Sequence, residues 1–304
     1  MLQALVESWA NLKLPEGTSV RFLVVENDET PHSLGIIETL RSRFPAPGLH
    51  HLLEPRPGIP VARNRALDYG IDLGSDLLCF VDDDEEVSTD WLCELVSMYR
   101  KTGAIAIGGP IVPKKPDGPL DAKADRIYSG VKAQAEERNK RVAKRTEAGN
   151  FRHLTVATNN CLFDLSIVGR GSLRFDESMV WTGGTDAKLS AEVATAGHQL
   201  GWAPSAIVFE TQPEARLSGR YIVKTTRDRV AVYIERKLEE NRSYLVVIPA
   251  ILLIRIAVYV LLFPASFTSS KAQFMNLHNS GWILAILRIF FRIKSTRYRN
   301  VTGY

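Results

Sequence analysis

DLLCFVDDDEE, residues 76–86, is the stretch that decides the fold. Its first six residues form a short, largely apolar run, typical of a strand that is buried in a parallel sheet. Five acidic residues follow without a break. Open α/β sheets bind their ligands beyond the carboxyl ends of the strands. A strand that runs directly into carboxylates therefore predicts a binding site at this point.

Strands and helices alternate on either side of this stretch, after a short amphipathic helix within residues 1–14. Further strands are predicted at 20–25, 49–53, 104–111 and 206–209, and helices at 31–44, 62–69, 88–101 and 187–196. This alternation predicts an α/β fold, a mixed but mainly parallel sheet with helices on both faces.

The composition is that of an ordinary globular protein. The chain has 304 residues, of which 45% are hydrophobic and 24% charged, enough for one large domain with an appendage. The net charge of +4 is too small to indicate a nucleic-acid partner, and none is expected. The three cysteines lack metal-ligand spacing and predict buried thiols in a reducing compartment.

The acidic residues are of the type that binds a hard cation. Asp82 and Asp84 alternate, so their side chains can face one side of an extended segment, and two carboxylates there would hold Mg²⁺ or Mn²⁺. The cation would in turn bridge a diphosphate, which carboxylates alone would repel. The alternative is an acidic stretch stabilised by the dipole of the following helix.

Two further residues add to the candidate site. Arg63, about one strand earlier, can offer a cation to a phosphate, although arginines on helices are commonly plain surface residues. Asp186 follows two glycines and can take a proton from an attacking hydroxyl. An equally good interpretation of Asp186 is a cap for the helix at 187–196. Trp181 and Trp202 are either sugar-stacking or buried side chains.

The order of six motifs resembles the inverting family-2 glycosyltransferases, in particular the branch that acts in succinoglycan-type polysaccharide biosynthesis. These motifs are VVEND (24–28), PGIPVARNRAL (57–67), CFVDDDE (79–85), TNNCLF (158–163), GGTD (183–186) and GWAPSAIVFE (201–210). The resemblance implies a GT-A fold, a nucleotide-diphosphate-sugar donor, expected to be a UDP-sugar, and Mg²⁺ or Mn²⁺.

The resemblance also implies roles for individual residues. Asp82 and Asp84 would be the D-x-D pair, with Asp84 as the direct metal ligand and Glu210 completing the metal site. Asp186 would be the catalytic base. The donor would be bound by Glu26, Asp28, Arg63, Asp82 and Asp83.

The sequence departs from the family pattern in two places. Thr185 stands where relatives pair an acid with the catalytic aspartate. The chain also begins at the first helix, without the apolar strand and polar turn with which relatives open, so we expect an N-terminally incomplete glycosyltransferase domain over residues 1–240.

Residues 241–304 are predicted to associate with a membrane. The apolar stretch 245–263 reaches about 28 Å as a helix, near the thickness of a bilayer core, but Arg255 lies in its middle. A second apolar stretch, 282–293, lies in a tail that carries five basic and no acidic residues from 281 to 304. Spanning the bilayer, lying on it and a buried helical hairpin all remain open. The polar segment 114–150 is interpreted as a solvated helix, or else as a mobile flap or a basic face for phosphate-bearing partners.

These features predict a metal-dependent inverting hexosyltransferase on the cytoplasmic face of a bacterial inner membrane. Its acceptor would be a lipid-linked glycan or a growing polysaccharide. One alternative is a catalytically silent, membrane-associated subunit of a polysaccharide-synthesis system. Another is a metal-dependent phosphohydrolase.

Overall fold

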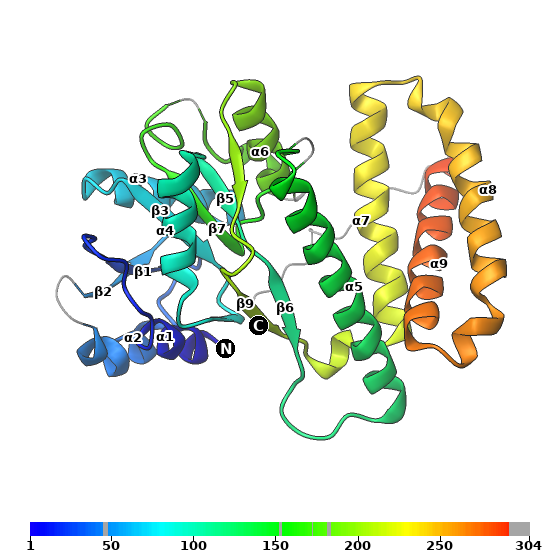
Figure 1. Cartoon of the computed structure of the whole chain (residues 1–304), viewed down its shortest axis with the longest axis horizontal. Helices are drawn as coiled ribbons and strands as arrows, with labels where there is room; N and C mark the ends of the chain where they lie inside the picture. Colours follow the sequence, from blue (N-terminus) through cyan, green and yellow to red (C-terminus); the bar gives the residue numbers. More distant parts are fainter. Residues whose placement is uncertain (45–47, 152–153, 172, 181–183, 292–304) are drawn as a thin grey trace. The chain divides into compact units, whose positions relative to one another are not determined.

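The computed structural model describes residues 1–44, 48–151, 154–171, 173–180 and 184–291 (Figure 1). The chain forms two compact units. We call Met1–Val112 with Arg138–Glu210 the sheet unit, and Pro113–Glu137 with Thr211–Tyr304 the helical unit. The long helix α5, Ala122–Glu147, belongs to both.

The sheet unit contains most of the strands. Its helices are α1 (Leu2–Trp9), α2 (Leu34–Leu40), η1 (Arg41–Arg43), α3 (Ile59–Asp72), α4 (Trp91–Thr102), η2 (Glu177–Met179) and α6 (Thr185–Thr195). Its strands are β1 (Phe22–Glu26), β2 (Leu49–Leu53), β3 (Leu77–Val81), β4 (Glu85–Val87), β5 (Ala106–Gly108), β7 (Asn160–Asp164) and β8 (Leu200–Trp202). Strands β6 (Ile111–Lys114) and β9 (Val208–Thr211) cross its boundary.

The central sheet has the strand order β3-β7-β5-β8. Strand β7 runs antiparallel to β3 and β5, and β5 runs parallel to β8, so β3, β5 and β8 all point the same way. Strands β1 and β2 form a parallel pair, and β4-β9-β6 form a third sheet in which β4 and β9 are antiparallel. The predicted mixed sheet is confirmed, with more antiparallel pairing than expected because β7 lies between two parallel strands.

Helices cover both faces of the central sheet, as predicted. Side chains alternate along β5, so Ile107 and Ala106 face opposite sides. Ile107 packs in a core with Leu95 of α4, whereas Ala106 packs in another with Leu67 of α3 and Leu189 of α6. A third core beneath β1 and β2 joins α1 to α2.

The acidic stretch is more ordered than a loop. Glu85 and Glu86 belong to strand β4, where Glu85 is paired with Glu210 of β9. The burial of these side chains follows the alternation of a strand, in which successive side chains point to opposite faces. Glu85 and Val87 are buried, whereas Glu86 between them is not. The predicted strand at 104–111 is likewise divided, into β5 and β6.

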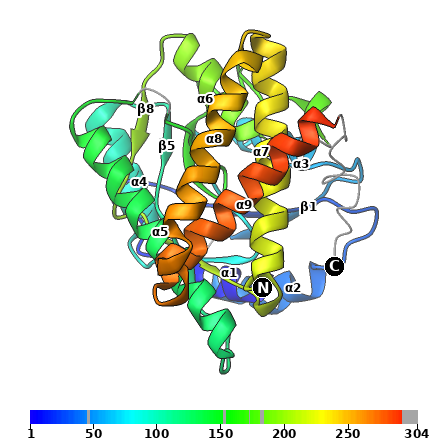
Figure 2. The same ribbon diagram turned by 90° about the vertical axis from the view of Figure 1, so that its right-hand side faces the viewer.

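The helical unit contains the first part of α5 together with α7 (Gly219–Glu240), α8 (Tyr244–Leu262) and α9 (Ser270–Phe290), and the short turns η3 (Glu214–Arg216) and η4 (Pro264–Phe267). Figures 1 and 2 show α7, α8 and α9 side by side. The predicted domain boundary at residue 240 falls after α7, whereas the structure groups α7 with α8 and α9. The reason is that Ile234 of α7 packs in one apolar core with Ile248 of α8 and Ile286 of α9.

Helix α8 has an apolar surface that the described residues of the helical unit leave exposed. It is the helix, within the described part of the chain, that is long and apolar enough to cross a membrane by length and composition. Its mean hydropathy is 2.8 and only 6% of its apolar window is buried, so it is not a core helix. Val246, Leu253 and Leu261 are 81%, 68% and 77% exposed.

Arg255, the charged residue in the middle of the apolar helix α8, contacts α9. These contacts stabilise a charge that would otherwise be costly in an apolar environment. Its Nη1 donates to Asn279 Oδ1 at 3.1 Å, and its guanidinium lies 4.3 Å from the centre of the Trp282 ring. A cation over an aromatic ring is stabilised by the ring's negative face. Arg288 of α9 pairs with buried Asp228 at 3.2 Å. Arg292 and the rest of the basic tail lie outside the described residues.

Candidate functional site

The acidic loop, residues 82–84, is folded around the buried carboxylate of Glu85. The backbone N–H of Asp82 donates to Glu85 Oε2 at 3.0 Å, and Asn159 Nδ2 donates to Glu85 Oε1 at 2.9 Å. Glu85 is 2% exposed. Because both of its oxygens accept hydrogen bonds, Glu85 fixes the turn that carries the three aspartates at the carboxyl end of β3.

Raised carboxyl pKa values are the main property of this loop and of Glu85 beside it. Asp82 keeps contact with solvent, but many protein atoms surround it, and this desolvation raises its pKa to about 6. The Arg63 guanidinium opposes that shift, and the neighbouring carboxylates add to it. Burial, followed by repulsion from Asp82 and Glu210, raises the pKa of Glu85 to about 9. Burial and Asp84 also raise the pKa of Asp83. Oxygen ligands crowded in this way are the kind that a divalent cation would stabilise.

Glu210 of β9 lies close to the carboxylates of Asp82 and Glu85. It stands opposite Glu85 in the β4–β9 register and contributes to the raised pKa of both Asp82 and Glu85. Among the described residues no group of three or more Asp, Glu, His or Cys side chains is arranged to hold a metal ion. Mg²⁺ in proteins takes carboxylate oxygens and commonly substrate phosphates as ligands.

Arg63 lies between the acidic loop and helix α6. Its charge is the main influence that lowers the pKa of Asp82. Its Nη1 donates to the hydroxyl of buried Thr185 at 3.2 Å, and its guanidinium lies 5.6 Å from the centre of the Phe175 ring. Arg63 is thus a positioned side chain rather than a plain surface arginine.

Asp186 lies in the first turn of α6, next to Thr185. The cap position belongs to Gly184, whose φ of 82° is left-handed, so the interpretation of Asp186 as the helix cap is wrong. Asp186 Oδ1 accepts from the N–H of Ala187 at 2.9 Å. Because Thr185 contacts Arg63, Asp186 belongs to the same part of the sheet unit as the acidic loop. Trp181 and Gly183 lie outside the described residues.

Glu26, at the carboxyl end of β1, holds the loop that follows it. Its carboxylate accepts from the N–H groups of His32 and Ser33 at 2.6 and 3.1 Å, from the Ser33 hydroxyl at 2.6 Å and from His51 Nε2 at 2.8 Å. Burial alone would raise the pKa of Glu26, but these hydrogen bonds outweigh it and lower the pKa. Asp28 is exposed and accepts from the N–H of Glu29 at 2.7 Å.

Asn27 was not predicted as a site residue, yet it joins β1 to the loop before α3. Its Nδ2 donates to the carbonyls of Glu54 and Arg56 at 2.8 and 2.7 Å, and its Oδ1 accepts from Gly58 N–H at 2.8 Å. Gly58 has φ 131°, and a Cβ there would lie 2.8 Å from Val180, so only glycine fits. The motifs VVEND and PGIPVARNRAL are therefore connected through Asn27.

We expect Glu26→Gln to weaken the sheet unit by about 1–2 kcal/mol at pH 7, since it replaces an anion that accepts four hydrogen bonds. A depressed folded-state pKa stabilises the protein above the unfolded-state value and loses that effect as pH falls through the folded-state value. The difference from the unaltered protein should therefore shrink between pH 5 and pH 3. Urea unfolding across this range measures it. Glu29→Gln, which removes an exposed neighbouring carboxylate, should show no such trend.

The motifs TNNCLF and GWAPSAIVFE each contain a residue that stabilises the fold. Asn160 accepts from Trp91 Nε1 at 2.8 Å and donates to the carbonyls of Pro110 and Ala206 at 2.9 and 2.8 Å, so it ties β7 to its neighbours. Trp202 is 7% exposed, in agreement with the interpretation as a buried side chain.

Residues 1–163 match the family model described as glycosyl transferase family 2, and the chain belongs to this family. The membership, together with the mixed sheet covered by helices on both faces, confirms the predicted GT-A fold.

Among individual relatives, the succinoglycan biosynthesis protein ExoM of Rhizobium meliloti (strain 1021) is 32% identical over 224 residues. The match covers 72% of this chain and 65% of ExoM, so the chain spans just under two thirds of that relative's length. The crystal structure of S. aureus TarS 1–349 is similar with a TM-score of 0.48 and 13% identity, over 95% of this chain and 88% of that one. The same TarS fragment in complex with UDP-GlcNAc has a TM-score of 0.49, at the same identity and coverage.

Proposed function

We propose that this protein is a metal-dependent inverting glycosyltransferase. It would move a hexose from a nucleotide-diphosphate donor, expected to be a UDP-sugar, to a hydroxyl of a lipid-linked glycan or a growing polysaccharide. The observation that carries the proposal is the crowded acidic loop at the end of β3, with Arg63 beside it and Asp186 beyond Arg63, in a member of glycosyl transferase family 2.

Asp82 and Asp84 would hold the cation, Mg²⁺ or Mn²⁺, with Glu210 as a third carboxylate. When bound, such a cation supplies positive charge to the diphosphate that leaves the donor. Glu85 does not face the donor; it keeps the turn of the acidic loop in shape through the hydrogen bonds from Asp82 and Asn159. Asp83 lies on the same loop and would contribute to donor binding less directly.

Arg63 would contact the donor phosphates, since a guanidinium fixed by Thr185 offers a bidentate donor at a set position. Asp28, with the loop held by Glu26, would lie by the nucleoside. Asp186 would take the proton from the acceptor hydroxyl as that oxygen attacks the sugar. A base on the acceptor side and positive charge on the leaving group suit a single displacement, which converts an α-linked donor into a β-glycoside.

A panel of nucleotide sugars, tested by thermal unfolding with Mn²⁺ or with EDTA, tests this proposal. One donor should raise the melting temperature in the presence of Mn²⁺ and lose most of that effect in EDTA, because a ligand stabilises the state that binds it. The same donor should yield a nucleoside diphosphate when an acceptor extract is added. Binding without turnover would favour the silent subunit, and release of free phosphate would favour a phosphohydrolase.

We further propose that α8 attaches the protein to the cytoplasmic face of a bacterial inner membrane. The exposed apolar side chains of α8 support this, and the contacts of Arg255 with Asn279 and Trp282 place its charge against α9 instead of on the exposed apolar face.

Replacing Leu253 and Leu261 together by glutamate should release the protein from membranes. A charge near the centre of a membrane helix, where Leu253 lies, costs about 2.5–3.5 kcal/mol, and glutamate at Leu261 adds a second charge to the exposed surface near the end of α8. Fractionation of a bacterial lysate should find the double variant mainly in the supernatant and the unaltered chain in the pellet. Leu14→Glu, at a 44% exposed leucine of the sheet unit, is the matched control and should stay in the pellet. An unchanged distribution of the double variant would contradict attachment through α8.

A further inference from the structure

A small cavity of about 170 Å³ lies within the sheet unit, apart from the acidic loop. It is lined by Arg138, Val142, Arg145, Thr146, Asn150, Leu154, Thr155 and Trp202. Sites for complete drug-sized ligands measure about 300–1,000 Å³. This cavity therefore has room for one chemical group or one ring, not for a whole nucleotide sugar.

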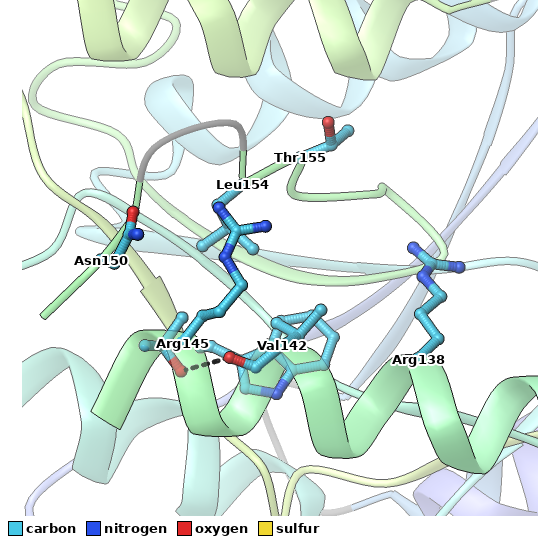
Figure 3. Close-up of a pocket in the computed structure, with 8 residues that line it drawn as sticks. Arg138, Val142, Arg145, Asn150, Leu154 and Thr155 are labelled. Carbon is cyan, nitrogen blue, oxygen red and sulfur yellow. Dashed lines mark hydrogen bonds between the residues drawn. The ribbon is translucent and has the colours of Figure 1, made fainter. Parts of the chain in front are cut away.

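Two arginines form one wall of the cavity. Arg138 and Arg145 are seven residues apart on α5, so they lie two turns apart on the same face of the helix. Figure 3 shows both side chains extending from α5 toward the segment that carries Leu154 and Thr155, with Val142 between them on the helix. None of the lining residues is acidic. The wall thus offers two guanidinium groups, which bind phosphate and carboxylate through paired N–H donors.

Trp202 adds a donor that has no partner among the described residues. Its Nε1 is buried and makes no hydrogen bond with them, although buried polar atoms are nearly always paired. The benzene edge of the indole packs against Gly108, where a Cβ would lie 3.1 Å from Cζ3. Since Nε1 is on the opposite edge of the indole, it points away from Gly108.

The cavity and the acidic loop lie along the same edge of the central sheet. Phe80, Cys161, Gly108 and Trp202 are register partners in one row across β3, β7, β5 and β8. Three strand spacings separate the ends of that row, which is about 14 Å. Asp82 comes two residues after Phe80, and the carboxyl ends of β3 and β8 face the same way. One extended molecule can therefore reach both places.

We propose that this cavity is a subsite for the acceptor, and that it binds an oxyanion which the acceptor carries some distance from the reacting hydroxyl. The oxyanion is a phosphate or a sugar carboxylate, bound by Arg138 and Arg145, and the Trp202 side chain forms part of the wall of the same cavity. This inference rests on the proposed function, because it treats the acidic loop as the place where the donor sugar is held.

Titration of the full-length protein with pyrophosphate, glucuronate and glucose, followed by calorimetry in EDTA, tests the subsite. EDTA removes divalent cations, so phosphate binding at the acidic loop is suppressed. We expect pyrophosphate or glucuronate to bind, and Arg138→Gln and Arg145→Gln each to weaken the binding about tenfold. Trp202→Phe, which keeps an aromatic ring in the wall, should leave the binding within a few-fold of that of the unaltered protein. Preference for pyrophosphate over glucuronate identifies a phosphate-linked acceptor, and the reverse an acidic sugar.

Lys144→Gln is the matched control, because it removes a positive charge from the same stretch of α5 outside the cavity lining. Equal weakening in Lys144→Gln would mean diffuse attraction and would overturn the subsite. So would the absence of binding by both anions, or binding of glucose with the same affinity. The two arginines are exposed, so their variants should fold even if Trp202→Phe does not. Donor binding, measured separately with Mn²⁺, decides the proposed function whatever these titrations show.

Discussion

Asp84→Asn is expected to lower the rate of sugar transfer by about 10³-fold while the protein keeps its fold. The amide has the shape of the carboxylate but not its charge, so a divalent cation would lose the ligand that we propose to be its most direct one. The affinity for the donor in the presence of Mn²⁺ should fall with the rate, whereas the weaker binding seen in EDTA should not change. Released UDP, measured at saturating acceptor, gives the rate, and circular dichroism checks the fold.

Asp83→Asn is the matched control for this experiment. It neutralises a neighbouring carboxylate of the same loop, so it reproduces the change in net charge without removing Asp82 or Asp84, the two proposed metal ligands. We expect it to retain most of the activity. Equal losses in the two variants would indicate that the loop acts through its total charge, and full activity in Asp84→Asn would refute the proposed cation site.

Asp186→Asn should lower the rate of transfer by about 10²–10⁴-fold, the usual contribution of a general base. Unlike Asp84→Asn, it should leave donor binding in Mn²⁺ within a few-fold of the unaltered protein, because Asp186 would act on the acceptor hydroxyl. Comparing donor affinity with transfer rate in the two variants therefore separates the metal site from the base.

The control for Asp186 is Glu192→Gln, on the same helix. Glu192 pairs with Lys188 at the helix surface at 3.7 Å, so its loss changes the charge of α6 away from the acidic loop. Its rate should be unaltered. If Asp186→Asn transfers sugar at the normal rate, another group must take the proton, and the role proposed for Asp186 is wrong.

Much of the sheet unit could be predicted from the sequence, because its strands are short apolar runs with clear ends. The strand at 49–53 has the predicted limits, and the strand before the acidic loop begins one residue later than predicted. The burial of Glu85 in strand β4 could not be predicted in this way. Five consecutive acids predict an exposed loop, and the only opposing signal was the alternation of Glu85 with Val87. Its partner Asn159 is 74 residues away along the chain.

The contacts between distant motifs could not be predicted from the sequence either. Arg63 and Thr185 are 122 residues apart, and nothing in either segment predicts that they form a hydrogen bond. Arg255 is similar: the sequence indicates that a charge in an apolar helix is costly, but not that Asn279 and Trp282 accommodate it. Periodicity predicts which face of an element is buried, whereas pairing across the fold depends on how the elements pack.

Because the helical unit is assembled from two separate stretches, the chain passes between the two units at three places, after Val112, Glu137 and Glu210. The second passage lies inside the continuous helix α5. A single cut therefore cannot release either unit whole. Protein engineers who wish to exchange the helical unit between relatives would need to replace two separate stretches, with one junction inside a helix. Over evolutionary time the same geometry favours inheritance of the two units together.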